Sequence, residues 1–142
     1  MSLLPRKGVL AITAVIDIAL HARNHPVAAK ALAARLGLPP RHLEPVLQAL
    51  VRSGVLKGRR GPRGGYELGR EQCYVTADDV LRAAGSVDNA ETPMSGSELL
   101  TQVVAPALAQ ADEALAGALA RITVEELVRA ADALHRQEVR RA

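Results

Sequence analysis

Apolar residues recur every three or four positions through residues 8–53, which is the spacing of helices that bury one face. This pattern predicts a helix over residues 8–24 and a short helix over 28–36 that Gly37 closes as its C-terminal cap. A third helix is expected to end near Ser53. Its inward positions are Leu43, Val46, Leu47 and Leu50.

Residues 54–68 have a different pattern, which predicts a β-hairpin. Val55 and Leu56 begin one strand, and Tyr66 and Leu68 alternate on the next. Glycine and proline fill the turn between the strands. We expect Tyr66 to anchor the hairpin in the core.

Helical signals return after the hairpin. Residues 76–84 form a predicted short helix with Thr76 as its N-cap and Asp79 in its first turn. Residues 85–96 have no periodicity and are rich in polar and turn-forming residues, so we interpret them as a loop.

From residue 98 the spacing again predicts a helix, which starts near Pro106 or bends there. Its apolar seam is typical of a helix that pairs with another helix, and a two-fold partner is favoured over packing on the chain's own domain. The seam consists of Val104, Leu108, Ala111, Leu115, Ala118 and Ile122. A capping box at residues 123–126 begins a last helix to about Arg136, followed by a basic tail, 136–141, that is expected to fray.

With 142 residues, the chain is expected to form one domain or one domain plus an arm. Ala, Leu and Val carry most of its apolar content, with two Tyr and no Phe or Trp, so dimerisation is a natural way to bury more surface. The apolar run 9–20 is too short to span a bilayer and lacks the cleavage site of a signal peptide. We therefore expect a cytoplasmic protein without membrane contact.

A short helix, a glycine-containing turn and a second helix with a polar outer face are typical of a helix-turn-helix. Such a polar face suits base edges, although any exposed helix has one. It carries Arg41, Glu44, Gln48 and Arg52.

The basic hairpin that follows favours double-stranded DNA as the partner, because a tight loop of like charges needs an anion. Its cations are Lys57, Arg59, Arg60 and Arg63, and no acid lies between Glu44 and Glu67. Pro45 predicts a delayed start or a local distortion of the third helix.

Several motifs in this order resemble the Rrf2 family of dimeric winged-helix transcription regulators, the IscR type. They are residues 7–20, 43–44, 53–56, the wing sequence RGPRGGYEL at 60–68, and 122–127. The resemblance implies a mainly α fold with a small β-hairpin wing and a long dimerisation helix. It also implies that Arg60 enters the minor groove, that Pro39, Arg41 and Glu44 stand at the major groove, and that repression is the usual mode.

The sequence departs from the family pattern at four places. Pro45 stands where relatives carry a polar residue, Arg63 where the wing has glycine, and Leu108 where relatives often have tryptophan. Residues 88–97 contain none of the cysteines that hold an iron–sulfur cluster in many relatives. The chain has only one cysteine, so we expect no such cluster and no other cofactor. The expected organisation is a DNA-binding domain over 1–85, a linker or sensor loop over 86–97, and the dimerisation and C-terminal helices over 98–142.

The signal that controls such a regulator stays open, and an unidentified small-molecule effector is one alternative. A second is a thiol-based switch at Cys73, although a buried, inert cysteine is favoured. His21 and His25 could share a metal, but Pro26 ends their helix and disfavours this interpretation. Asp17 is interpreted as a solvent-facing or ion-paired acid. No catalytic arrangement is present and we do not expect an enzyme; a third hypothesis is a protein-interaction adaptor that has lost specific DNA binding.

Overall fold

The computed structural model describes residues 4–85 and 97–141, and the predicted loop over 85–96 and linker over 86–97 therefore lie almost wholly outside the described residues. The fold is mainly helical with one two-stranded antiparallel sheet. In chain order the elements are α1 (Arg6–His21), α2 (Ala29–Leu36), α3 (Pro40–Arg52), β1 (Leu56–Arg59), β2 (Gly65–Leu68), the 3-10 turn η1 (Gln72–Tyr74), α4 (Ala77–Gly85), the π-helical segment η2 (Leu99–Val104), α5 (Ala105–Leu119) and α6 (Val124–Arg141). The predicted fold class is confirmed.

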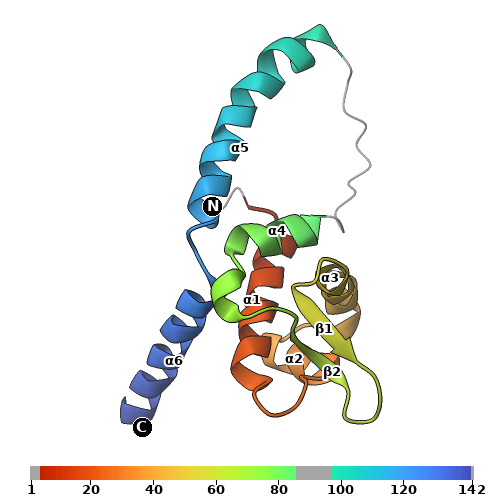
Figure 1. The fold of residues 1–142 in the computed structure, drawn as a ribbon, viewed down its shortest axis with the longest axis vertical. Coiled ribbons are helices and arrows are strands. Elements are labelled where there is room, and N and C mark those ends of the chain that lie inside the picture. Colours follow the sequence, from red (N-terminus) through yellow and green to blue (C-terminus); the bar gives the residue numbers. More distant parts are fainter. Residues whose placement is uncertain (1–3, 86–96, 142) are drawn as a thin grey trace.

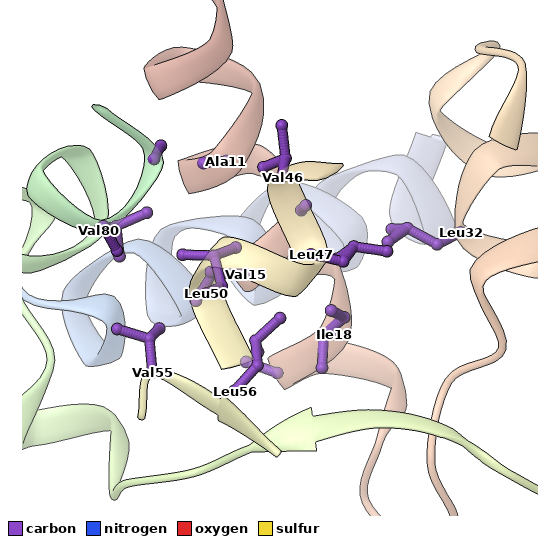
Figure 2. Close-up of a cluster of buried hydrophobic side chains, with 14 of the residues drawn as sticks. Ala11, Val15, Ile18, Leu32, Val46, Leu47, Leu50, Val55, Leu56 and Val80 are labelled. Carbon is purple, nitrogen blue, oxygen red and sulfur yellow. The ribbon is translucent and has the colours of Figure 1, made fainter. Parts of the chain in front are cut away.

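Helix α1 lies at the centre, and α2, α3, α4, α6 and β2 all pack against it (Figure 1). Val15 and Ile18 are fully buried on this helix and meet Leu47 and Leu50 of α3 in the core (Figure 2). Burying each such aliphatic side chain contributes about 1.5–3 kcal/mol relative to leaving it in water. We call residues 4–85, which contain most of this core, the winged-helix body.

The predicted helix-turn-helix is confirmed in α2 and α3. Gly37 closes α2 in the left-handed conformation, with φ at 68°, where glycine avoids the Cβ clash that other residues suffer. Helix α3 then begins at Pro40, so the delayed start expected from Pro45 is wrong. The physical reason is that Pro40, as the first helical residue, has its φ already set and needs no amide donor. The helix continues without a break past Pro45 to Arg52.

The start of α4 forms the predicted capping box. The amide of Asp79 donates to Thr76 Oγ1 at 3.1 Å, and the amide of Thr76 donates to the Asp79 carboxylate at 3.0 Å. Thr76 also forms a β-bridge with Thr123, which holds the start of α6 beside the start of α4. The body therefore extends its packing to the first turn of α6, where Val124 and Val128 are buried.

Segment η2 and helix α5 form an arm, residues 99–119, that projects away from the body (Figure 1). The α-helical part begins at Ala105, which confirms the predicted start near Pro106. The π-helical turn lies just before Pro106. Proline has no amide N–H, so one of the usual helical hydrogen bonds is missing there. Ile122 is not part of this helix, contrary to the predicted seam, because α5 ends at Leu119 and a turn follows.

Helix α6 continues to Arg141, so the prediction that its basic tail frays is wrong. Arg140 and Arg141 lie in its last turn, where cations interact favourably with the negative end of the helix dipole. Its start matches the prediction, since the amide of Glu126 donates to Thr123 Oγ1 at 3.2 Å. Within the described residues, no helix combines the length and apolarity needed to cross a membrane.

Candidate nucleic-acid interface

Helix α3 presents a polar face opposite its buried face. Leu43, Val46, Leu47 and Leu50 are buried, as predicted. The side chains of the opposite face are all exposed: Arg41, Glu44, Gln48 and Arg52. Arg41, Glu44 and Arg52 have no hydrogen bond or ion pair to the described parts of the chain, which leaves their charged groups available to an external partner.

The wing is a regular hairpin in which Leu56 pairs with Leu68 and Lys57 with Glu67. Its turn closes through a 2.9 Å hydrogen bond from the amide of Gly64 to the carbonyl of Gly61. Gly61 has φ at 109°, a conformation that side chains other than hydrogen rarely permit. The hairpin thus holds its basic turn, residues 60–64, in a defined shape.

The wing cations fall into two groups. Arg59 forms a 2.8 Å ion pair with Glu67, and Lys57 lies 3.9 Å from the same carboxylate. Arg60 and Arg63 are exposed and have no such partner among the residues that the structure describes. Sequence reasoning missed the role of Glu67, although its position opposite Lys57 follows from the hairpin register. The uncompensated positive charge is therefore concentrated in the turn.

The wing is fixed to the helix-turn-helix by Val27. Val27 and Tyr66 exchange two backbone hydrogen bonds of 2.8 Å, so Val27, two residues before α2, extends the hairpin by an isolated bridge. Gly65 makes this approach feasible, since a Cβ at that position would overlap the carbonyl oxygen of Val27. No pattern in the sequence indicated Val27, because an isolated bridge has no periodicity.

Tyr66 links the wing to the recognition helix. Its half-buried ring packs against the core, as predicted for an anchor of the wing. Its hydroxyl accepts a long, 3.4 Å hydrogen bond from Gln48 Nε2. Two candidate DNA-contacting elements, α3 and the wing, are therefore neighbours with a defined relative position.

Asp17 is ion-paired, as expected, and its partner is Arg35 of α2. The guanidinium donates to both carboxylate oxygens, with distances of 2.7–3.1 Å. These hydrogen bonds from Arg35 to Asp17 raise the pKa of Arg35 above its ordinary value. The pair holds α2 against α1 and keeps Arg35 charged.

Cys73 is exposed in η1, and the preference for a buried cysteine is wrong. The cause is the 3-10 turn, which has no buried residue and directs Val75, two residues later, into the core instead. Cys73 Sγ donates a long hydrogen bond to the Glu71 carboxylate at 3.9 Å. His21 and His25 both lie near the end of α1, and the described residues contain no group of three or more His, Cys, Asp or Glu side chains suited to a metal.

Comparison with known proteins agrees with this geometry. Residues 4–130 match the model of the Rrf2 family, described as an iron-dependent transcriptional regulator. The chain belongs to the Rrf2 family. A curated relative from Serratia proteamaculans, the HTH-type transcriptional regulator IscR, is 34% identical over 137 residues, which cover 92% of this chain and 82% of the relative.

Two solved structures of Rrf2-type regulators share the fold. IscR of T. potens superposes with a TM-score of 0.69 and 27% identity, covering 90% of this chain and 87% of that protein. CymR of B. subtilis, the global cysteine regulator, gives a TM-score of 0.66 and 26% identity, with 91% and 98% covered. The protein is accordingly a transcriptional regulator of the Rrf2 type with a winged-helix DNA-binding body.

Proposed function

We propose that this Rrf2-family protein binds palindromic operators in double-stranded DNA as a homodimer and acts as a repressor. The observation that carries the proposal is a wing with uncompensated arginines held beside an exposed polar recognition helix. A loop with charges of one sign becomes favourable when it meets the phosphates and the narrow minor groove of DNA. Arg60, near the tip of this loop, is the side chain that we assign to the minor groove.

Helix α3 would supply the base contacts. Arg41 and Gln48 can hydrogen-bond to purine edges in the major groove, and Glu44 can accept from the amino group of cytosine. Pro45 lies on the same exposed surface and offers no hydrogen bond, so base reading at its position would rest on shape and apolar contact. Arg52, at the end of the helix, is better suited to a phosphate.

The arm would supply the dimer contact. Leu108 is 59% exposed in the monomer, and no residue of α5 is buried there. The proposed apolar stripe runs along one face of the arm: Val104, Leu108, Ala111, Leu115 and Ala118. Two-fold pairing through this stripe would set the two recognition helices into successive major grooves about 34 Å apart.

We also infer that the protein does not carry a cysteine-held iron–sulfur cluster. Such a cluster needs several thiolates, and this chain has one cysteine, which lies in η1 between the wing and α4. The donor set therefore does not fit a cysteine-held iron–sulfur cluster, although the family is described as iron-dependent. Purified protein containing stoichiometric iron and sulfide would contradict this inference.

Operators can be obtained by sequencing the genomic DNA that the purified protein retains, and affinity for them is then measured against salt concentration. We expect steep salt dependence, and Arg60→Ala should weaken operator binding by about fivefold to a hundredfold, as expected for a groove contact worth about 1–3 kcal/mol. Arg136→Ala on α6, which removes the same charge outside the wing and α3, is the matched control and should leave affinity unchanged.

Two other functions remain distinguishable in the same assay. A protein-interaction adaptor would bind genomic DNA without sequence preference or not at all.

The exposure of Cys73 favours testing a thiol-based switch. Under that alternative an oxidant changes operator affinity, and Cys73→Ser abolishes the change while leaving affinity in reductant unaltered.

A further inference from the structure

A cleft of about 710 Å³ lies between the turn of the wing and the corner where α1 leads into α2. Its lining includes His21 and His25 from the end of α1 and the segment after it, Arg35 from α2, and Pro62 and Arg63 from the wing. The bridge between Val27 and Tyr66 holds the two sides together. The cleft is thus a built feature of the body, in which side chains from separate parts of the chain converge.

The charges around the cleft favour an anion. Asp17, behind the lining, would repel one, but its carboxylate is already engaged by two hydrogen-bonding nitrogens of Arg35. Arg63 has no hydrogen bond or ion pair within the described parts of the chain. The charges of Asp17 and Arg35 cancel each other, which leaves Arg63 as a cation without a counter-charge. It adjoins a cleft and occupies a position where the sequence departs from the wing pattern of its family.

The ability of the two histidines to donate a hydrogen bond to an anion depends on their protonation. His21 Nδ1 lies 2.8 Å from the carbonyl oxygen of Asp17, and His25 Nδ1 lies 3.3 Å from that of Pro26. A carbonyl oxygen can only accept, so each Nδ1 must carry the proton of the hydrogen bond. In the neutral ring Nε2 is then a lone-pair acceptor, which cannot donate to an anion. Only the imidazolium form presents an Nε2–H donor.

We propose that this cleft binds a phosphate group, with Arg63 as a permanent contact and His21 and His25 as contacts that form on protonation. The phosphate would be one of the DNA backbone beside the wing, an assignment that rests on the function proposed above. Binding then draws protons onto the imidazoles, and the affinity for DNA rises as pH falls. The charged groups that face the histidines are Asp17, Arg35 and Arg63. Asp17 Oδ1 lies 3.5 Å from His21 Nδ1 and 2.7 Å from Arg35, with which it forms an ion pair, and Arg63 is cationic throughout.

The test compares the dependence of operator affinity on salt at about pH 6 and about pH 8, the interval in which imidazole commonly changes charge. In the wild-type protein we expect operator affinity at fixed salt to rise at the lower pH, while the slope of log affinity against log salt steepens by less than about one, because one phosphate accounts for about one unit of slope in all. The combined variant His21→Gln, His25→Gln should lose most of both changes. Arg63→Ala should reduce the slope by up to about one, most clearly at the higher pH.

His135→Gln on α6 is the matched control and should keep the wild-type difference between the two pH values. His42 of α3 is retained in every protein, so any contribution from it cancels in the comparison. Circular dichroism and thermal unfolding check that the variants fold; both cleft histidines are exposed, so the substitutions leave no cavity. A pH effect on affinity and slope that is as large in the combined variant as in the wild-type protein would refute the assignment to DNA phosphate.

A second arm separates a DNA phosphate from a free one. Inorganic phosphate is titrated calorimetrically into the protein at the lower pH without DNA. If the combined variant keeps the wild-type DNA response but loses heat of phosphate binding, the cleft takes free phosphate and the DNA source is wrong. If neither response changes, the cleft proposal fails. A wild-type protein that binds no operator at either pH contradicts the proposed function instead, and the calorimetric arm still tests the cleft.

Discussion

The winged-helix body and the arm contain similar aliphatic residues, but the body buries them whereas the arm leaves them exposed. Leu47 of α3 is fully buried in the body, whereas Leu108 of α5 is 59% exposed. The second half of α5, from Asp112 to Leu119, lines a groove with Leu81 and Pro5 of the body. The body together with the start of α6 covers its own core, whereas the arm leaves much of its apolar face exposed.

This difference teaches that the arm's stability should depend on the proposed dimerisation, while the shape of the DNA-facing surface depends on the body. A stripe of exposed leucine and valine along a helix costs solvation free energy until another surface meets it. The apolar face of α3, in contrast, is already covered by other elements of the same chain. Substitutions in the two regions should accordingly affect different observables, oligomeric state for the arm and unfolding for the body.

The largest effect is expected from Leu108→Glu. A charge in the proposed dimer seam would be placed there twice by the two-fold axis, and the dimer dissociation constant should rise by about a hundredfold or more, because a buried unpaired charge costs several kcal/mol. Sedimentation velocity at a series of concentrations measures this. Ala109→Glu, on the far side of the same helix, introduces the same charge and should leave the dimer intact. Equal effects of both variants would contradict the assigned face.

Leu47→Ala should act on the body. Removing a fully buried leucine lowers the free energy of unfolding by about 3 kcal/mol through lost burial and the cavity that remains. Urea denaturation followed by circular dichroism gives the value. Leu134→Ala on α6, where the leucine is 56% exposed, is the control and should change stability by less than about 0.5 kcal/mol.

Gly65→Ala should loosen the wing within the body. Its φ of 152° and the contact with the Val27 carbonyl leave no room for a Cβ. We expect a loss of about 1–3 kcal/mol in stability, the usual range for a forced backbone strain. Gly58→Ala in the neighbouring strand meets open space and should be nearly neutral. Hydrogen exchange of the Val27 and Tyr66 amides should accelerate in the first variant only.

The smallest effect is expected from Asp17→Asn. Arg35, its partner, is 35% exposed at the side chain, so the pair should contribute no more than about 1 kcal/mol and less in high salt. Because the pKa of Arg35 is raised in the folded protein, its contribution is present below the unfolded pKa and is lost only as pH rises through the folded value. Both values lie in the strongly alkaline range. The stability difference between wild type and variant should therefore stay constant from about pH 7 to about pH 9, as urea titrations at each pH can check.

Much of the body was predictable from local patterns. The helix-turn-helix, the hairpin, Gly37 and the Thr76 capping box follow from periodicity and from residue types with strong backbone preferences. Polar candidates on α3 and the wing were predicted from residue type and spacing, and the structure places their side chains at the surface. The spacing of apolar residues also predicted the helix of the arm and its apolar stripe, which the structure leaves largely exposed.

Other features depended on contacts between distant segments. The exposure of Cys73 follows from a short 3-10 turn that directs Val75 into the core instead. Local sequence gives little warning of this, because it depends on how neighbouring elements fill the core. The Val27–Tyr66 bridge and the Asp17–Arg35 pair join residues far apart in the chain, and single-sequence patterns carry no information on such pairs.

By itself, the sequence determined the order of helices and strands, the positions of the basic turn and the polar face of α3, and the lack of thiolates for a cluster. These properties reside in residue type and short-range spacing, where backbone preference and hydrophobic periodicity act directly. Only the tertiary structure decided which cations remain without partners and which groups share a cleft. Glu67 compensates Arg59, Asp17 engages Arg35, and Arg63 is left beside two histidines, because charge compensation depends on distance in space and not along the chain.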